Sequence, residues 1–232
     1  MTTLAPPPNT PAPTGRATIP KAALPNMGRA VIKDIMPPKL ILNAVEGWGK
    51  TSCGAYAPKP FILMAAGETG YTTLLGAKRV KEVDTVLNDE GKPKSIENWQ
   101  ELLVVLDYFA KNDTDYKTIV LDALGGFERL CHEYVCNRDF KGVWGEKGFA
   151  SYQKGYEVSV ADWLKMLKLL EDINDKAITV LILSHSQIRP QKDPLHEGFD
   201  RYIASVHHKT WSPTAKWADA VLFANYIAIP EK

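Results

Sequence analysis

A short apolar segment that runs into a glycine-containing turn and then into Lys-Thr is the feature that most constrains the fold of this 232-residue chain. This order is typical of a phosphate-binding loop. Successive backbone N–H groups there surround the phosphates, the lysine reaches the terminal phosphate, and the threonine hydroxyl holds Mg²⁺. We therefore predict a nucleotide-binding strand–loop–helix unit. Its contacting residues would be Ala44, Val45, Glu46, Gly47, Trp48, Gly49, Lys50, Thr51 and Ser52.

The loop departs from the usual pattern at one position. Ala44 stands where the pattern has its first glycine, five residues before Gly49. If that position required a positive φ, alanine would cost roughly 1 kcal/mol. The plainer alternative is an ordinary strand–turn–helix that contains Gly-Lys-Thr by chance.

Composition indicates a globular chain rather than a membrane or disulfide-rich one. Apolar residues make up 45% and charged residues 24% of the chain, and no apolar run approaches the ~20 residues of a membrane span. The first residues lack the basic and apolar regions of a signal peptide, and three cysteines fit reduced thiols. We therefore expect a cytoplasmic protein. A net charge of +1 gives no broad electrostatic footprint for nucleic acid.

Proline marks a change in character along the chain. Residues 1–27 are rich in Pro, Thr and Ala, so we expect a flexible tail that cannot bury enough apolar surface to fold. Residues 28–232 are expected to form one domain.

Apolar runs of strand length alternate with helical patterns in the rest of the chain. We expect strands at residues 39–43, 61–66, 118–122, 178–183 and 220–224, and helices at 51–57, 74–80, 127–135 and 160–170, with one more capped by Ser95. Such alternation predicts an α/β fold, with a mostly parallel sheet of about five or more strands and helices on both faces. Residues 138–156 are expected to form a long loop, and residues 184–216 a polar stretch.

Polar residues at the carboxyl ends of the predicted strands suggest the rest of a nucleotide-hydrolysing site. Asp122 ends the third strand and could accept a hydrogen bond from Mg²⁺-bound water beside Thr51. Glu68 follows the second strand and is the candidate general base. His185 follows the fourth strand and is the candidate γ-phosphate sensor, with Gln187 as its competitor. The alternatives are that Asp122 caps a helix, that Glu68 is a solvated loop residue, and that His185 is only a packed or capping side chain.

Together these segments resemble the RecA-like P-loop ATPases of bacteriophages, in particular the Sak-type single-strand-annealing recombinases, also described as phage ATP-binding proteins. The resemblance covers roughly residues 37–230. Its matching segments are residues 45–51, 116–124, 183–186, 199–202 and 217–226, the last of which begins Trp-Ala-Asp.

The resemblance implies a RecA-like core in which the sensor strand lies between the Walker A and Walker B strands. It also implies Mg²⁺-dependent ATP hydrolysis, assembly into a ring or filament, and single-stranded DNA binding in phage DNA recombination or replication. The location would then be the host cytoplasm, and a single-strand-binding protein would be a partner. In the family two loops hold DNA, and the corresponding segments are residues 138–156 and 187–210. A clear adjacent DNA-binding domain is missing.

Cations in these two segments could contact DNA, and aromatic rings between them could stack on bases. The DNA-binding candidates are Arg138, Lys141, Trp144, Lys147, Lys154, Arg189 and Lys192. Candidates for a finger that completes a neighbour's site are Arg189, Arg201 and Lys209. The alternative is that the rings pack on the core and the charges are solvated. Two other functions stay open: an ATP-gated annealing or scaffold protein with little turnover, and a nucleotide kinase.

Overall fold

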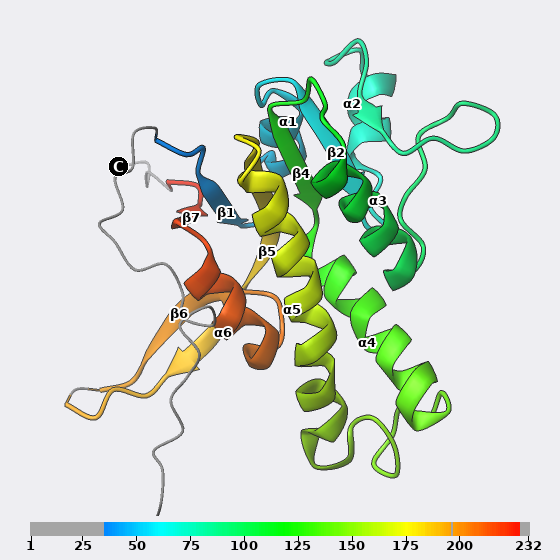
Figure 1. Ribbon diagram of the computed structural model, residues 1–232. Coiled ribbons are helices and arrows are strands. Elements are labelled where there is room, and N and C mark those ends of the chain that lie inside the picture. The colour runs from blue at the N-terminus through cyan, green and yellow to red at the C-terminus, as the bar shows by residue number, and fades with distance from the viewer. Residues whose placement is uncertain (1–34, 196, 228–232) are drawn as a thin grey trace, which may run out of the picture. The chain divides into compact units, whose positions relative to one another are not determined.

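A computed structural model describes residues 35–195 and 197–227 (Figure 1). Contacts divide the chain into two units, Met1–Ile35 and Met36–Lys232, and the predicted tail (residues 1–27) lies outside the described residues. The second unit contains, in order, β1 (Lys39–Ala44), α1 (Lys50–Ala55), β2 (Pro60–Met64), α2 (Gly70–Gly76), β3 (Asp84–Thr85), α3 (Trp99–Lys111), β4 (Thr118–Asp122), α4 (Leu124–Phe140), a 3-10 turn (Ser151–Gln153), α5 (Lys154–Asn174), β5 (Thr179–Gln191), β6 (Phe199–Ala204), α6 (His208–Trp217) and β7 (Ala220–Ala224).

The described strands form one seven-stranded sheet, and its strand order sets the position of the site. The order is β3-β2-β4-β5-β1-β7, and β6 pairs with β5 outside this path. All pairs within the path are parallel, whereas β5 and β6 are antiparallel. The predicted α/β class with a mostly parallel sheet is therefore confirmed. β5 lies between β1 and β4, as expected for a sensor strand.

Alternate residues of the central strands pack against different helices, so both faces of the sheet are covered. One face carries Ile41, Leu63, Ile119, Leu121, Val180 and Ile182, which pack in one cluster with residues of α3, α4 and α5. The opposite face carries Leu42, Ile62, Met64, Val120, Leu181 and Leu183, which pack with Tyr71 and Leu74 of α2. Burial on both faces explains why these strands read as continuous apolar runs in the sequence.

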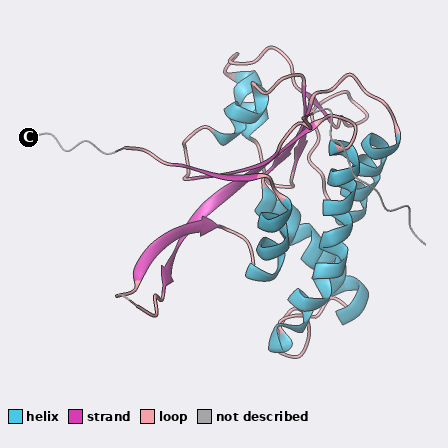
Figure 2. Cartoon of the chain, turned by 60° about the vertical axis from the view of Figure 1, so that its left-hand side comes forward, coloured by secondary structure: helices cyan, strands magenta, loops and turns pink. Residues whose placement is uncertain are grey.

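The polar stretch expected at residues 184–216 contains regular elements that the sequence did not predict. β5 continues to Gln191 and forms a hairpin with β6, with Ser186 opposite Ala204 and Gln191 opposite Phe199. The hairpin extends away from the helices (Figure 2), and most of its residues are exposed. An exposed hairpin needs no alternating apolar pattern, so periodicity gave no signal for it.

Two further boundaries differ from the expectation. Asn98, rather than Ser95, caps α3, because its side-chain oxygen accepts a hydrogen bond from the backbone of Glu101 at 2.9 Å. The loop expected at residues 138–156 is shorter, since α4 continues to Phe140 and α5 begins at Lys154. Both helices therefore extend past the apolar positions from which they were predicted, as is common at helix ends.

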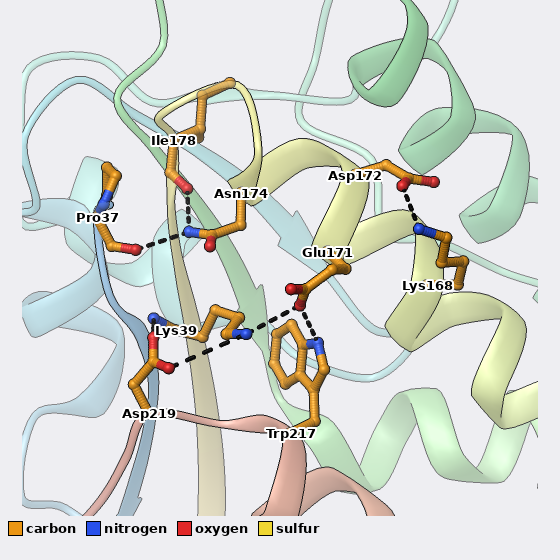
Figure 3. A network of polar contacts seen from close by, with 9 residues as sticks. All are labelled: Pro37, Lys39, Lys168, Glu171, Asp172, Asn174, Ile178, Trp217 and Asp219. Carbon is orange, nitrogen blue, oxygen red and sulfur yellow. Dashed lines mark hydrogen bonds and ion pairs between the residues drawn. The ribbon is translucent and has the colours of Figure 1, made fainter. Parts of the chain in front are cut away.

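The Trp-Ala-Asp sequence at residues 217–219 leads from α6 into the edge strand β7. Its side chains and backbone contact the start of β1 (Figure 3). The indole Nε1–H of Trp217 donates to Glu171 Oε2 at 2.7 Å, and Lys39 Nζ lies 2.9 Å from the same oxygen. The backbone N–H of Lys39 donates to Asp219 Oδ2 at 2.8 Å, while the N–H of Asp219 donates to the Lys39 carbonyl at 2.9 Å. The motif thus fixes β7 beside the strand that leads into the candidate phosphate loop.

Candidate nucleotide-binding site

The turn between β1 and α1 has the backbone conformation that its glycines permit. Gly47 has φ +73° and Gly49, which precedes the first turn of α1, has φ +106°. Ala44 is the last residue of β1 and pairs with both His185 and Ala224. Since Ala44 has an ordinary strand conformation, the cost considered for alanine at this position does not arise.

Lys50 begins α1 and folds its side chain back over the turn. Its Nζ donates to the carbonyls of Ala44 at 3.2 Å and Val45 at 3.1 Å. Burial lowers the pKa of the ammonium below its usual value, against the opposing attraction of Asp122 and Glu68. A cation held over the turn by neutral carbonyls can exchange these contacts for the oxygens of an anion.

Thr51 and Asp122 meet at the carboxyl edge of the sheet. The Thr51 hydroxyl donates to Asp122 Oδ2 at 2.9 Å. Asp122 ends β4 and is nearly fully buried, and this burial raises the pKa of its carboxyl to about 6, although the Thr51 hydrogen bond acts the other way. The two oxygens are hard donors of the kind that Mg²⁺ prefers, and a cation beside them would offset the cost of a buried carboxylate.

No other part of the described chain offers an obvious metal site. Among the described residues, no cluster of three or more His, Cys, Asp or Glu side chains could hold a metal ion. A site with one carboxylate and one hydroxyl fits the usual binding of Mg²⁺, which takes few protein ligands and completes its shell with phosphate oxygens and water. The donor set here therefore fits Mg²⁺ bound together with a nucleotide.

Glu68, in the loop after β2, and His185, within β5, lie close to each other. His185 Nε2 lies 3.7 Å from Glu68 Oε1. This contact is the main cause that lowers the pKa of the Glu68 carboxyl below its usual value, with burial acting in the opposite direction. Glu68 is therefore ionised at neutral pH, which is the protonation state that a general base requires.

All of these groups line one cavity of about 380 Å³. Its walls include Gly47, Gly49, Lys50, Thr51, Ser52, Glu68, Asp122 and His185, all selected from the sequence. Gln187 does not line it, because its side-chain amide donates to the Ala204 carbonyl at 3.2 Å and thereby holds the hairpin. Of the two sensor candidates, the structure therefore brings only His185 to the cavity.

Sequence reasoning missed four residues of the same cavity. Gly70, Thr73, Leu74 and Arg79 complete its wall, and they belong to α2 or follow it. The segment around α2 gave only an ambiguous helical pattern, so no spacing connected these residues to the site. A built Cβ on Gly47 would lie 3.2 Å from the hydroxyl of Tyr226, so this tyrosine also lies beside the turn.

The DNA-binding and finger candidates lie elsewhere, and none of them lines the cavity. Arg138 forms ion pairs with Asp139 at 2.7 Å and with the buried Asp162 at 2.9 Å. Lys209 pairs with Glu157. Lys141, Trp144, Lys147, Lys154, Arg189, Lys192 and Arg201 are exposed.

The aromatic rings of the first predicted DNA loop are largely packed on one another. Phe149 is completely buried and contacts the rings of Phe140, Trp144 and Tyr156, with centroids 4.9 to 5.6 Å apart. Tyr152 is fully exposed. Most rings of this loop therefore stabilise the ends of α4 and α5, as the alternative reading proposed.

A mostly parallel sheet, a glycine-containing turn between β1 and α1, and a buried carboxylate at the end of β4 define the core of a P-loop NTPase. A family model described as AAA domain matches residues 36–230, and the chain belongs to this family. Membership indicates nucleotide binding and ATP hydrolysis. A comparison with curated proteins finds no match. Among the described residues, no helix has both the length and the apolar character needed to cross a membrane.

Proposed function

We propose that this domain binds ATP with Mg²⁺ at the carboxyl edge of its sheet and hydrolyses the γ-phosphate bond. The observation that supports this most directly is that Lys50, Thr51, Asp122, Glu68 and His185, drawn from four separate segments, line one cavity. The cavity opens at the first turn of α1, where unpaired backbone N–H groups favour phosphate.

Each side chain then has a distinct role in the proposed reaction. Lys50 exchanges its contacts with the Ala44 and Val45 carbonyls for phosphate oxygens. Thr51 and Asp122 would hold the cation. When bound, Mg²⁺ neutralises charge that develops on the transferred phosphoryl group.

Glu68 and His185 act on the attacking water and the γ-phosphate. The ionised Glu68 carboxylate accepts a proton from the water and orients it. His185, whose Nε2 lies 3.7 Å from Glu68 Oε1, donates a hydrogen bond to the γ-phosphate and so reports its presence to β5. Because β5 continues directly into the hairpin, a change at His185 would be transmitted along one strand.

The test is Mg²⁺-dependent phosphate release by the full chain and by Lys50→Ala, with Lys111→Ala as the matched control. Lys111 is an exposed lysine of α3 that pairs with Asp107. We expect Lys50→Ala to lose hydrolysis while its circular dichroism is unchanged, and Lys111→Ala to behave as the wild type. Normal turnover by folded Lys50→Ala, or no nucleotide binding by the wild type, would refute the assignment.

We further propose that the hairpin of β5 and β6 binds single-stranded DNA in an oligomer, as the resemblance to phage recombinases implies. Arg189 and Arg201 are opposite each other in the hairpin, and both are exposed. Phe199 and Tyr202 are exposed on β6, where Phe199 offers a ring for stacking and the Tyr202 ring already stacks on Phe223 with centroids 4.9 Å apart. The role in phage recombination rests on the resemblance alone.

Two measurements test this extension. We expect single-stranded DNA to stimulate phosphate release by the wild type, and the double variant Arg189→Ala/Arg201→Ala to lose the stimulation but keep the basal rate. Gel filtration with a non-hydrolysable ATP analogue should show a larger species than without it. Assembly without any turnover would instead favour the ATP-gated annealing or scaffold function.

A further inference from the structure

Arg79 has a fixed position in the cavity wall that neither the sequence pattern nor the proposed reaction explains. Lys78, two residues after the end of α2, is in the left-handed region with φ +54°, and the N–H of Arg79 donates to the Leu74 carbonyl at 3.0 Å. The Tyr56 hydroxyl donates to the Arg79 carbonyl at 2.7 Å. The backbone of Arg79 is therefore held by Leu74 of α2 and by Tyr56, which follows α1, and Arg79 is part of the cavity wall.

These contacts place Arg79 away from the phosphate end of the cavity. Phosphate binds at the first turn of α1, whereas Tyr56 follows the last residue of this helix. Six helical residues span about 9 Å, so the Tyr56 contact holds the Arg79 carbonyl from the opposite end of α1. A nucleotide whose triphosphate lies along Lys50–Ser52 would extend its base toward Arg79.

The side chains at the Arg79 end of the cavity can pack against the face of a base, but they offer few hydrogen-bonding groups for its edge. Leu74 is 7% exposed and supplies an apolar surface. The Thr73 hydroxyl already donates to the Thr69 carbonyl at 3.2 Å. Among the described residues that line the cavity, no side-chain amide is present, and the two carboxylates, Glu68 and Asp122, lie at the phosphate end.

Arg79 is also free for such a contact. It is exposed and forms no ion pair with an acidic side chain in the described part of the chain. A guanidinium group is planar and weakly hydrated, so it stacks on aromatic rings, whereas a lysine ammonium does not offer a flat face. Stacking of this kind accepts any base, because every base has a π face.

We propose that the Arg79 guanidinium stacks on the base of the bound nucleoside triphosphate, and that the site consequently accepts ATP and GTP with similar affinity. This inference rests on the proposed nucleotide site and adds its base-binding part. Discrimination of purines requires hydrogen bonds to the base edge, and the cavity wall provides no side chain placed to make them.

The experiment measures dissociation constants of Mg²⁺-ATP, Mg²⁺-GTP and Mg²⁺-tripolyphosphate by calorimetry on the full chain. The proteins are the wild type, Arg79→Ala, Arg79→Lys and the control Lys81→Ala, which removes an exposed cation two residues away. We expect both Arg79 variants to bind ATP and GTP about 5- to 30-fold more weakly, equivalent to about 1–2 kcal/mol. Tripolyphosphate, which has no base, should bind all four proteins equally.

Three results would overturn the proposal. Equal ATP affinity in wild type and Arg79→Ala would exclude a contact between the Arg79 side chain and the bound nucleotide. Weaker tripolyphosphate binding by Arg79→Ala that Arg79→Lys restores would assign Arg79 to the phosphates instead. A wild type that prefers ATP over GTP by more than about 30-fold would contradict stacking as the means of base recognition. Failure of the nucleotide site itself is distinguished by Lys50→Ala, which should lose all three ligands.

Discussion

The hydroxyl of Thr51 donates a 2.9 Å hydrogen bond to Oδ2 of Asp122, which lies 71 residues further along the chain. Thr51 follows β1 and Asp122 ends β4, and these two strands are separated in the sheet by β5. The contact is close because Gly70, at the start of α2, leaves room for the Thr51 side chain. A Cβ built on Gly70 would lie 2.5 Å from Thr51 Oγ1.

Gly70→Ala should therefore impair the proposed site without direct removal of any of its functional groups. The added methyl group would force the Thr51 side chain away from Asp122, because the Cβ would also lie 2.8 Å from Thr51 Cγ2. We expect Mg²⁺-ATP affinity to fall by about tenfold or more, and overpacking to lower the free energy of unfolding by about 1–3 kcal/mol. Calorimetry and urea unfolding measure the two effects.

Gly76→Ala is the matched control for this variant. Gly76 ends the same helix, has no atom within 4 Å of a built Cβ, and has no positive φ. Alanine there should be neutral or stabilise by up to about 1 kcal/mol, because it limits the unfolded chain. Equal affinity for Mg²⁺-ATP in the two variants would show that the Thr51 position does not matter for binding.

Glu68→Gln should separate nucleotide binding from hydrolysis. The amide keeps the shape of the side chain but cannot accept a proton from water, so we expect phosphate release to fall about 10²- to 10⁴-fold. Affinity for Mg²⁺-ATP should change little. Single-turnover assays and calorimetry measure the two quantities, with Glu90→Gln, an exposed acid paired with Lys92, as the control. A normal rate in Glu68→Gln would assign the role of base to another group.

The fold was predictable from the sequence where strands are buried on both faces. The runs that became β1, β2, β4 and the buried part of β5 are continuous apolar segments, and only a parallel sheet between helices buries such strands completely. β7 was also predicted at its observed bounds. The hairpin was missed because an exposed strand pair needs no apolar alternation, and α6 was missed because the two residues that it buries, Thr210 and Thr214, are polar.

The candidate site was predictable at the end formed by Lys50, Thr51 and Asp122, and not at the end formed by Arg79. Lys50, Thr51, Asp122 and Glu68 each stand at a strand end or turn, where spacing alone carries information. Arg79 reaches the cavity only because Lys78 adopts a left-handed conformation and Tyr56 holds the following carbonyl. Such a position depends on tertiary contacts, which a single sequence does not reveal.

Trp217→Phe should weaken the attachment of the edge strand β7. Phenylalanine keeps a ring near Lys39 but loses the indole N–H that donates to Glu171 at 2.7 Å. We expect the free energy of unfolding to fall by about 1 kcal/mol, with faster amide hydrogen exchange in β7. Lys168→Ala, which removes an exposed pair with Asp172 in the same region (Figure 3), should change stability by less than about 0.5 kcal/mol. Equal effects of the two substitutions would contradict this account.

Acid should destabilise the domain partly through His132. This α4 residue is 7% exposed, its Nε2 atom has no hydrogen-bond partner, and the rings of Phe149 and Tyr156 lie 5.4 and 5.1 Å from its own. Burial lowers the pKa of His132 to about 4, and the charge of His207 adds to the effect. The unfolded chain therefore binds the proton first as pH falls, since an unperturbed histidine has a pKa near 6.5.

The stability that neutral His132 provides is thus complete above about pH 6.5 and is lost as pH falls from there to about 4. The loss would reach about 3 kcal/mol at most. Asp122 acts in the opposite direction, because its pKa is raised to about 6 in the folded state and its protonation on acidification favours folding. His132→Phe should therefore flatten the pH dependence of urea unfolding relative to wild type, whereas His208→Ala, at an exposed position, should not. An identical pH dependence in wild type and His132→Phe would show that the pKa of His132 does not differ between the folded and the unfolded chain.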